Sequence, residues 1–113
     1  MARYLISFDD GAMTFPEEEL PDVDEAAHAV VKEAKDAGVW VFGGGLKDHG
    51  DACVVASDGT VTDGPHPDGK QYLGGFAVVE VPAREEALEW AAKLAVACRC
   101  AQEVREFLFD PTV

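Results

Sequence analysis

Side chains alternate between apolar and other positions near the start of the chain, and this predicts a first β-strand. Tyr4, Ile6 and Phe8 alternate with the residues between them, and a period of two residues is typical of a strand with two different faces. Residues 9–21 then carry two prolines, a glycine and three consecutive glutamates. This composition predicts a solvated loop with room for one helical turn.

The pattern changes to a helical period after residue 21. Asp22 is followed three residues later by Glu25, and this capping-box pair indicates a helix N-terminus. Gly38 stands where a helix C-terminus is expected. The apolar positions recur at spacings of three and four residues and form one stripe: Val23, Ala26, Ala27, Val30, Val31 and Ala34.

Four short strands are predicted ahead of a second helix. Residues 39–42 are uniformly apolar, which predicts a strand buried on both faces, and the three glycines at 43–45 end it. Residues 52–56 and 60–62 form a hairpin around a Ser-Asp-Gly turn. Residues 76–81 form the next strand.

A second helix starts near Ala83, and residues 102–109 form the last strand. The inner stripe of this helix comprises Ala87, Leu88, Ala91, Leu94 and Ala95. The order of elements predicts one α+β domain over residues 1–113, with a ferredoxin-like, split βαβ plan. Two helices cover one face of an antiparallel sheet in this plan, and the other face is left apolar. A second copy is therefore expected to pack sheet to sheet and form a homodimer.

Composition excludes several classes of partner. Acidic residues outnumber basic ones by 22 to 9, giving a net charge of −13, and such a surface repels phosphate backbones and anionic lipids. We expect no nucleic-acid partner. Apolar runs are too short to span a bilayer, and the N-terminus shows no cleavage-site pattern. Three cysteines, an odd number, argue against a disulfide framework and favour the cytoplasm.

One motif is more specific than the rest of the chain. Residues 61–76 read VTDGPHPDGKQYLGGF, and this segment resembles the signature of the YCII-related family, in the branch named for its DGPF motif. The resemblance continues through ALEWAA at 87–92 and EVR at 103–105. His28, in the first helix, falls at a histidine position common in that branch. Nearly the whole chain is covered.

The resemblance implies a ferredoxin-like subunit that pairs into a dimeric α/β barrel, with a cleft near the DGP turn. An aspartate and a histidine are the candidate catalytic groups, and they correspond to Asp63 and His28. One related type is a dehydrochlorinase of chlorinated hydroxyquinols, which implies lyase or proton-transfer chemistry on a small molecule. Members also often accompany extracytoplasmic-function sigma factors, so a non-catalytic ligand-binding or regulatory module is the alternative.

Each catalytic candidate also has a structural interpretation. Asp63 begins an Asp-Gly-Pro turn, and aspartate stabilises such turns through its own backbone without any chemistry. His28 lies away from the centre of the apolar stripe, as a solvated or boundary histidine would. If both face one cleft, the pair can shuttle a proton near neutral pH.

The chain departs from the resembled motif at two places. His66 replaces the phenylalanine, either as a filler of the same slot or as a second titrating group that contacts a ligand. Asp68 and Gly69 replace the usual acidic-threonine pair ahead of Lys70. Lys70 is a candidate for binding an anionic substrate group, or is simply solvated.

Glu80 and the aromatic residues complete the predicted pocket. Glu80 shares a strand face with Phe76, and a carboxylate there needs a partner. Arg105 is the expected partner, and a role in lining the pocket is the alternative. Tyr72, Phe76 and Trp40 are expected to supply apolar walls.

No cofactor site is predicted, and a metal site is only an alternative, which three scattered histidines with nearby aspartates leave open. Cys98-Arg99-Cys100 lacks the spacing of a zinc-binding pair, and a second pair to complete a tetrahedral site is missing from the sequence. The glycine run at 43–45 matches no phosphate-binding or dinucleotide-binding spacing.

Overall fold

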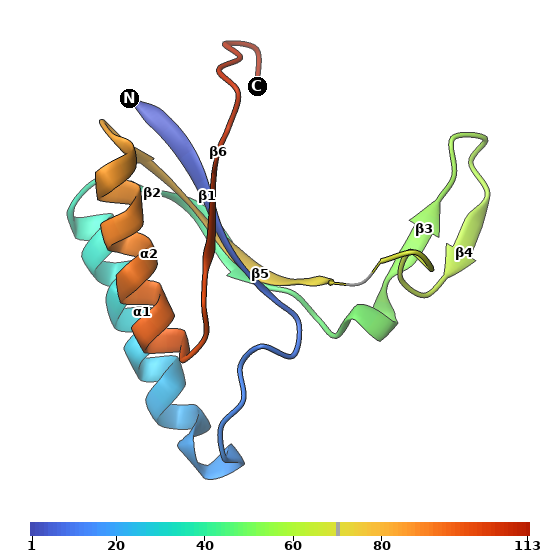
Figure 1. Cartoon of the computed structure of the whole chain (residues 1–113), viewed down its shortest axis with the longest axis horizontal. Coiled ribbons are helices and arrows are strands. Elements are labelled where there is room, and N and C mark those ends of the chain that lie inside the picture. Colours follow the sequence, from blue (N-terminus) through green and yellow to red (C-terminus); the bar gives the residue numbers. More distant parts are fainter. Residues whose placement is uncertain (70) are drawn as a thin grey trace.

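The computed structural model describes residues 1–69 and 71–113. Lys70, the residue predicted to bind an anionic substrate group, lies outside the described residues. The helices and strands follow the predicted order (Figure 1). They are β1 (Ala2–Asp9), η1 (Glu17–Glu19), α1 (Leu20–Asp36), β2 (Trp40–Gly45), η2 (His49–Asp51), β3 (Cys53–Val55), β4 (Val61–Asp63), β5 (Leu73–Val81), α2 (Arg84–Cys98) and β6 (Glu103–Glu106).

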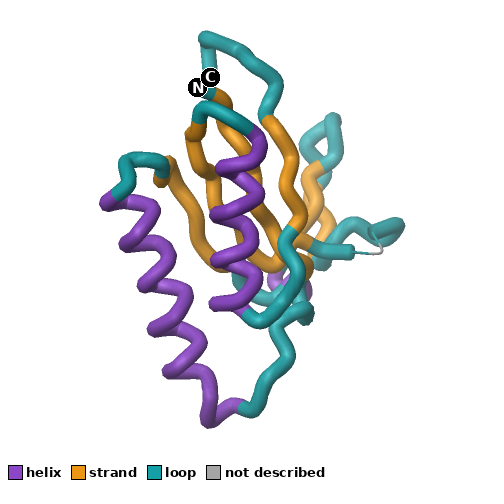
Figure 2. Tube along the Cα trace, turned by 60° about the vertical axis from the view of Figure 1, so that its left-hand side comes forward, coloured by secondary structure: helices purple, strands orange, loops and turns teal. Residues whose placement is uncertain are grey.

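The fold is ferredoxin-like, as predicted. Four strands form one antiparallel sheet in the order β2-β5-β1-β6, and α1 and α2 lie side by side on one face of it (Figure 2). The β3–β4 hairpin forms a separate two-stranded sheet and projects away from the helices (Figure 1). Within the described ranges, neither helix combines the length and the apolar composition that crossing a membrane requires.

The core forms where alternate residues of β1 and β5 meet the helices. Tyr4 lies opposite Val79, and Ile6 lies opposite Ala77; all four are buried, Ile6 completely. Burying a side chain such as Ile6 contributes about 1.5–3 kcal/mol relative to leaving it exposed. The alternation seen in the sequence therefore gives β1 one face that packs against the helices and one that does not.

The expectation that residues 39–42 form a strand buried on both faces is wrong. Within the main sheet β2 pairs with β5 alone, so it is an edge strand, and the side chain of Phe42 is 63% exposed. The glycines continue the strand rather than ending it. A Cβ atom at Gly43 would lie 2.6 Å from the carbonyl oxygen of Phe76, so the close approach of β2 to β5 requires glycine there.

The first helix begins earlier than the capping-box pattern predicts. Leu20 is its first residue and Glu19 its N-cap, with no side-chain hydrogen bond to the cap. Pro21 occupies the first turn, where its fixed φ angle and missing N–H are well tolerated. Gly38, with φ of 75°, follows the helix in the left-handed conformation that glycine adopts readily.

Candidate functional site

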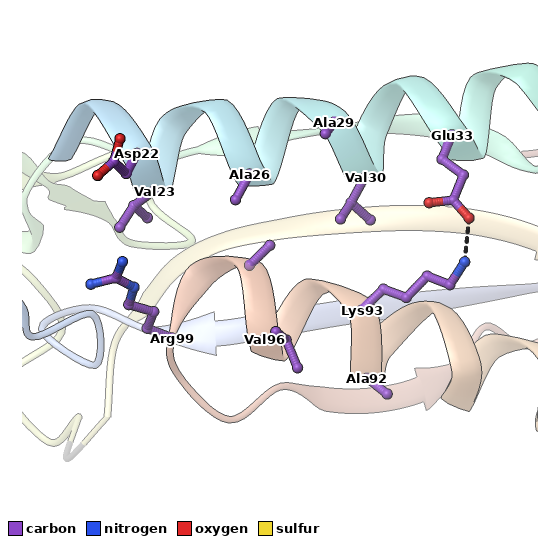
Figure 3. A pocket seen from close by; sticks show the side chains of 11 residues that line it. Asp22, Val23, Ala26, Ala29, Val30, Glu33, Ala92, Lys93, Val96 and Arg99 are labelled. Atoms are coloured by element: carbon purple, nitrogen blue, oxygen red, sulfur yellow. Dashed lines mark hydrogen bonds and ion pairs between the residues drawn. The ribbon is translucent and has the colours of Figure 1, made fainter. Parts of the chain in front are cut away.

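Three of the hollows formed by the described residues bear on function, and the first lies between the two helices. Val23, Ala26 and Val30 of α1 face Val96 and Lys93 of α2 across it (Figure 3). Alanine and valine make up most of its wall. Its cations are already paired, because Lys93 bonds Glu33 and Arg99 lies 3.2 Å from Glu19. This groove is a packing seam rather than a reactive site.

The second hollow, which we call the α1–sheet cavity, has a volume of about 580 Å³. It opens between α1 and the end of the sheet that carries the glycines of β2. Volumes of about 300–1,000 Å³ are usual for small-molecule sites. Its wall comprises Ile6, Phe8, Met13, Asp24, Ala27, His28, Val31, Lys35, Trp40, Phe42, Gly43, Gly44, Gly45, Phe76, Ala77, Leu94, Cys98 and Gln102.

His28 is held in one orientation by its own helix. Its Nδ1 lies 2.7 Å from the carbonyl oxygen of Asp24, one turn earlier. A carbonyl oxygen only accepts, so Nδ1 carries a hydrogen in both charge states of the ring. In the neutral ring Nε2 is therefore the nitrogen with the free lone pair, and it is the one available to a molecule in this cavity.

The other polar groups of the α1–sheet cavity are few. Lys35 supplies a cation on the same face of α1 as His28, and Gln102 supplies an amide. Burial raises the pKa of the Cys98 thiol, so this cysteine stays protonated at neutral pH. Most of the remaining wall is apolar, as is usual for a site that binds a small organic molecule.

The third hollow, which we call the hairpin cavity, has a volume of about 420 Å³. It lies where the segment after β2 meets the hairpin and the loop that leads to β5. Its wall comprises Leu46, Lys47, Asp48, His49, Asp51, Ala52, Cys53, Val54, Pro65, His66, Tyr72 and Leu73.

An aspartate from the end of β1 fixes His49 beside this cavity. Asp10 Oδ2 accepts the Nδ1–H and the backbone N–H of His49, each at 2.8 Å. These two bonds hold the pKa of Asp10 below its usual value. The ring of His49 also stacks on Tyr72, with centroids 4.6 Å apart and planes 9° apart. The orientation of the His49 ring is therefore set by the hydrogen bond from Nδ1 to Asp10 and by stacking on Tyr72.

His66 and Tyr72 belong to the hairpin cavity. The backbone N–H of Asp68 donates to His66 Nδ1 at 3.4 Å, so the neutral ring carries its hydrogen on Nε2. The Tyr72 hydroxyl donates to the carbonyl oxygen of Gly69 at 2.9 Å. The loop thus presents a histidine and a tyrosine to the same space as His49.

The structure divides the predicted site residues between two cavities. His28, Trp40 and Phe76 line the α1–sheet cavity, whereas His66 and Tyr72 line the hairpin cavity. Asp63 ends β4, is exposed and lies opposite Cys53 in the hairpin. None of these three hollows is lined by both His28 and Asp63, and their action as a pair stays a prediction.

Glu80 is placed on the sheet face that the helices leave open. Its Oε2 lies 2.8 Å from Arg3 Nε, and the two residues are direct partners in the β1–β5 ladder. The expected partner, Arg105, is therefore wrong, because β6 pairs with β1 and does not lie next to β5. Both side chains are over a third exposed, and such a surface pair contributes about 0–1 kcal/mol.

Sequence reasoning missed the pair Asp10 and His49. Thirty-nine positions separate them, and they meet because loop backbone bonds join neighbouring segments: Asp10 to Tyr72, and Leu46 to Gly74. The signal available in the sequence was a histidine between two aspartates directly after a predicted strand.

Comparison with known proteins agrees with the fold. The chain resembles a solved structure of 5-chloro-2-hydroxyhydroquinone dehydrochlorinase (TftG) from Burkholderia phenoliruptrix AC1100, in complex with 2,5-dihydroxybenzoquinone. The TM-score is 0.54 and the sequence identity 16%, over 99% of this chain and 98% of that one. Among curated proteins, none matches this sequence. The family described as the YCII-related domain matches residues 2–108, and the chain therefore belongs to the YCII-related family.

Proposed function

We propose that the protein is a small-molecule enzyme in which His28 transfers a proton within the α1–sheet cavity. The observation that carries this proposal is the bond from His28 Nδ1–H to the Asp24 carbonyl. It leaves Nε2 as the titrating nitrogen in a cavity of suitable size. General acid–base catalysis requires a histidine within hydrogen-bond reach of the substrate, and this orientation leaves Nε2 free for that contact.

The chemistry of the cavity suggests a flat, partly apolar substrate. Ile6, Phe8 and Trp40 provide apolar wall, and Lys35 provides a positive charge. This combination suits an aromatic or quinoid ring with an oxygen that is anionic or becomes so. The similar fold of a dehydrochlorinase in complex with 2,5-dihydroxybenzoquinone supports the same class of substrate.

The proposed reaction class is an elimination assisted by a proton transfer. In the keto tautomer of such a substrate, the chlorinated ring carbon carries a hydrogen. His28 Nε2 accepts the proton of a ring hydroxyl, the O–H electron pair forms a C=O bond, the neighbouring ring double bond shifts to the chlorinated carbon, and chloride leaves as the anion. Lys35 then offsets the negative charge that develops on the substrate oxygen. Asp63, which lies opposite Cys53 in the hairpin, is assigned no part in this step, and its pairing with His28 stays a prediction.

Chloride release from 5-chloro-2-hydroxyhydroquinone tests this proposal. Replacing His28→Asn keeps a polar side chain of similar reach but removes the titrating nitrogen, and we expect a loss of turnover of about 10²- to 10⁴-fold. His66→Phe, which restores the residue of the resembled motif outside this cavity, serves as the matched control and is expected to retain turnover. Equal activity of the His28 variant and the wild type would overturn the proposal.

A further inference from the structure

At the edge of the hairpin cavity, a group of metal-ligating side chains is left unused by the proposed function: Asp48 and His49 line the cavity, and Asp10 contacts His49 from the end of β1. Asp10, Asp48 and His49, which we call the His49 cluster, each offer an atom within 4.8 Å of the others. We propose that this cluster binds a divalent transition-metal cation, with Zn²⁺ as the type that suits it best. The proposal is independent of the reaction assigned to His28.

Distances within the His49 cluster fit a shared cation. His49 Nδ1 lies 2.8 Å from Asp10 Oδ2 and 4.0 Å from Asp48 Oδ1. Zinc bonds to imidazole nitrogen and carboxylate oxygen are about 2.0–2.2 Å long. Two ligands of one ion therefore lie at most about 4.4 Å apart, which is twice that bond length. Both separations from Nδ1 fall within this limit.

The donor set distinguishes among cations. One imidazole and two carboxylates suit zinc, nickel or cobalt, whereas magnesium and calcium favour oxygen ligands throughout. Three protein ligands leave at least one position for water or another small ligand, as in zinc sites that exchange ligands. His66 and Cys53 line the same cavity and add nitrogen and sulfur donors to its wall.

The central ligand of the His49 cluster is already oriented. Tyr72 stacks on the ring of His49, and the backbone N–H of His49 is bonded to Asp10. The hydrogen on Nδ1 points at Asp10 Oδ2, so a cation at this place takes the position of that hydrogen. In the neutral ring this hydrogen then moves to Nε2, and Nδ1 supplies its lone pair to the cation.

Charge and access both favour a cation. The protein has a net charge of −13, and Asp51 adds a further carboxylate to the wall of the cavity. Such a field raises the local concentration of cations. The side chains of Asp48 and His49 are 72% and 44% exposed, so an ion from solution can reach them without unfolding any element.

Calorimetric titration of the tag-free, chelator-treated protein with Zn²⁺ tests the proposal. We expect one site, and a fall in affinity in Asp10→Asn and His49→Ala at least as large as the roughly 10- to 100-fold cost of losing an outer-shell partner. Asp10→Asn keeps an oxygen that accepts from His49, so it removes the charge while preserving the local fold. His28→Asn, a histidine change in the other cavity, is the control and should leave the affinity unchanged.

A second readout separates direct ligation from a loss of structure. Circular dichroism identifies any variant that fails to fold, and Asp48→Asn then replaces it, since Asp48 is the most exposed member of the cluster. Weaker binding in folded variants supports the site. Absence of Zn²⁺ binding by the wild type at millimolar concentration overturns the proposal, as does unchanged binding in folded His49→Ala.

Discussion

The three histidines of this small protein are held by different partners, and these partners fix the tautomer of each ring. His28 donates from Nδ1 to a carbonyl of its own helix, and His49 donates from Nδ1 to the carboxylate of Asp10. His66 accepts at Nδ1 from the backbone N–H of Asp68. The residue types alone do not distinguish these cases, whereas the hydrogen-bond partners do.

Nitrogen chemical shifts of the imidazole rings test these assignments. At a pH where the rings are neutral, we expect the Nδ1–H form for His28 and His49 and the Nε2–H form for His66. Replacing Asp10→Ala should shift the tautomer balance of His49 and leave that of His28 as it is. A predominantly Nε2–H ring at position 28 would remove the basis for assigning Nε2 as its proton acceptor.

At the scale of the element, the glycines of β2 have unequal roles. A Cβ atom at Gly43 would lie 2.6 Å from Phe76 O and 2.9 Å from Ala77 Cα, and these are backbone atoms that cannot move aside alone. A Cβ atom at Gly44 would meet nothing within 4 Å. The two positions therefore form a matched pair: the neighbouring strand leaves no room for a side chain at Gly43, whereas a methyl group at Gly44 has open space.

Thermal unfolding of Gly43→Ala and Gly44→Ala measures this difference. We expect Gly43→Ala to lower the free energy of unfolding by about 1–3 kcal/mol, the usual cost of overpacking. That corresponds to a fall in Tm of roughly 4–8 °C for each kcal/mol in a domain of this size. Gly44→Ala should stay close to the wild type. Equal melting temperatures for the two variants would show that β2 does not approach β5 as described.

Local pattern predicted the order of the elements and the ferredoxin-like fold, because the alternation of β1 and the stripes of the helices follow directly from which face is buried. The local pattern gave the wrong burial for β2, since a run of four apolar residues does not distinguish a central strand from an edge strand. His28, His66 and Tyr72 were identified as cavity residues through the motif. The contact of Asp10 with His49 was out of reach, because it depends on how distant loops are joined.

At the scale of the whole molecule, one face of the sheet has no helix over it. Leu5 and Val78 are direct partners there in the β1–β5 ladder, and the Arg3–Glu80 ion pair lies on the same face. The strand neighbours of Val78, Ala77 and Val79, are buried on the helix side. An exposed apolar patch within such a face is typical of an interface, and this is the basis of the expectation that the protein forms a homodimer packed sheet to sheet.

Light scattering coupled to gel filtration tests the homodimer. We expect the wild type to elute as a dimer at micromolar concentration and Val78→Arg to elute as a monomer, because the charge would be buried between the two sheets. Val96→Arg is the control, since Val96 is 81% exposed on α2 and away from the sheet. A monomeric wild type, or a dimeric Val78 variant, would argue against this interface.

The central claim is that a small molecule binds in the α1–sheet cavity beside His28. Chemical-shift mapping with 2,5-dihydroxybenzoquinone, the compound in the structure of the similar dehydrochlorinase, tests it most directly. We expect saturable shifts at the His28 ring and the Trp40 indole, which both line that cavity. Shifts confined to the hairpin cavity, or none at millimolar concentration, would contradict the claim.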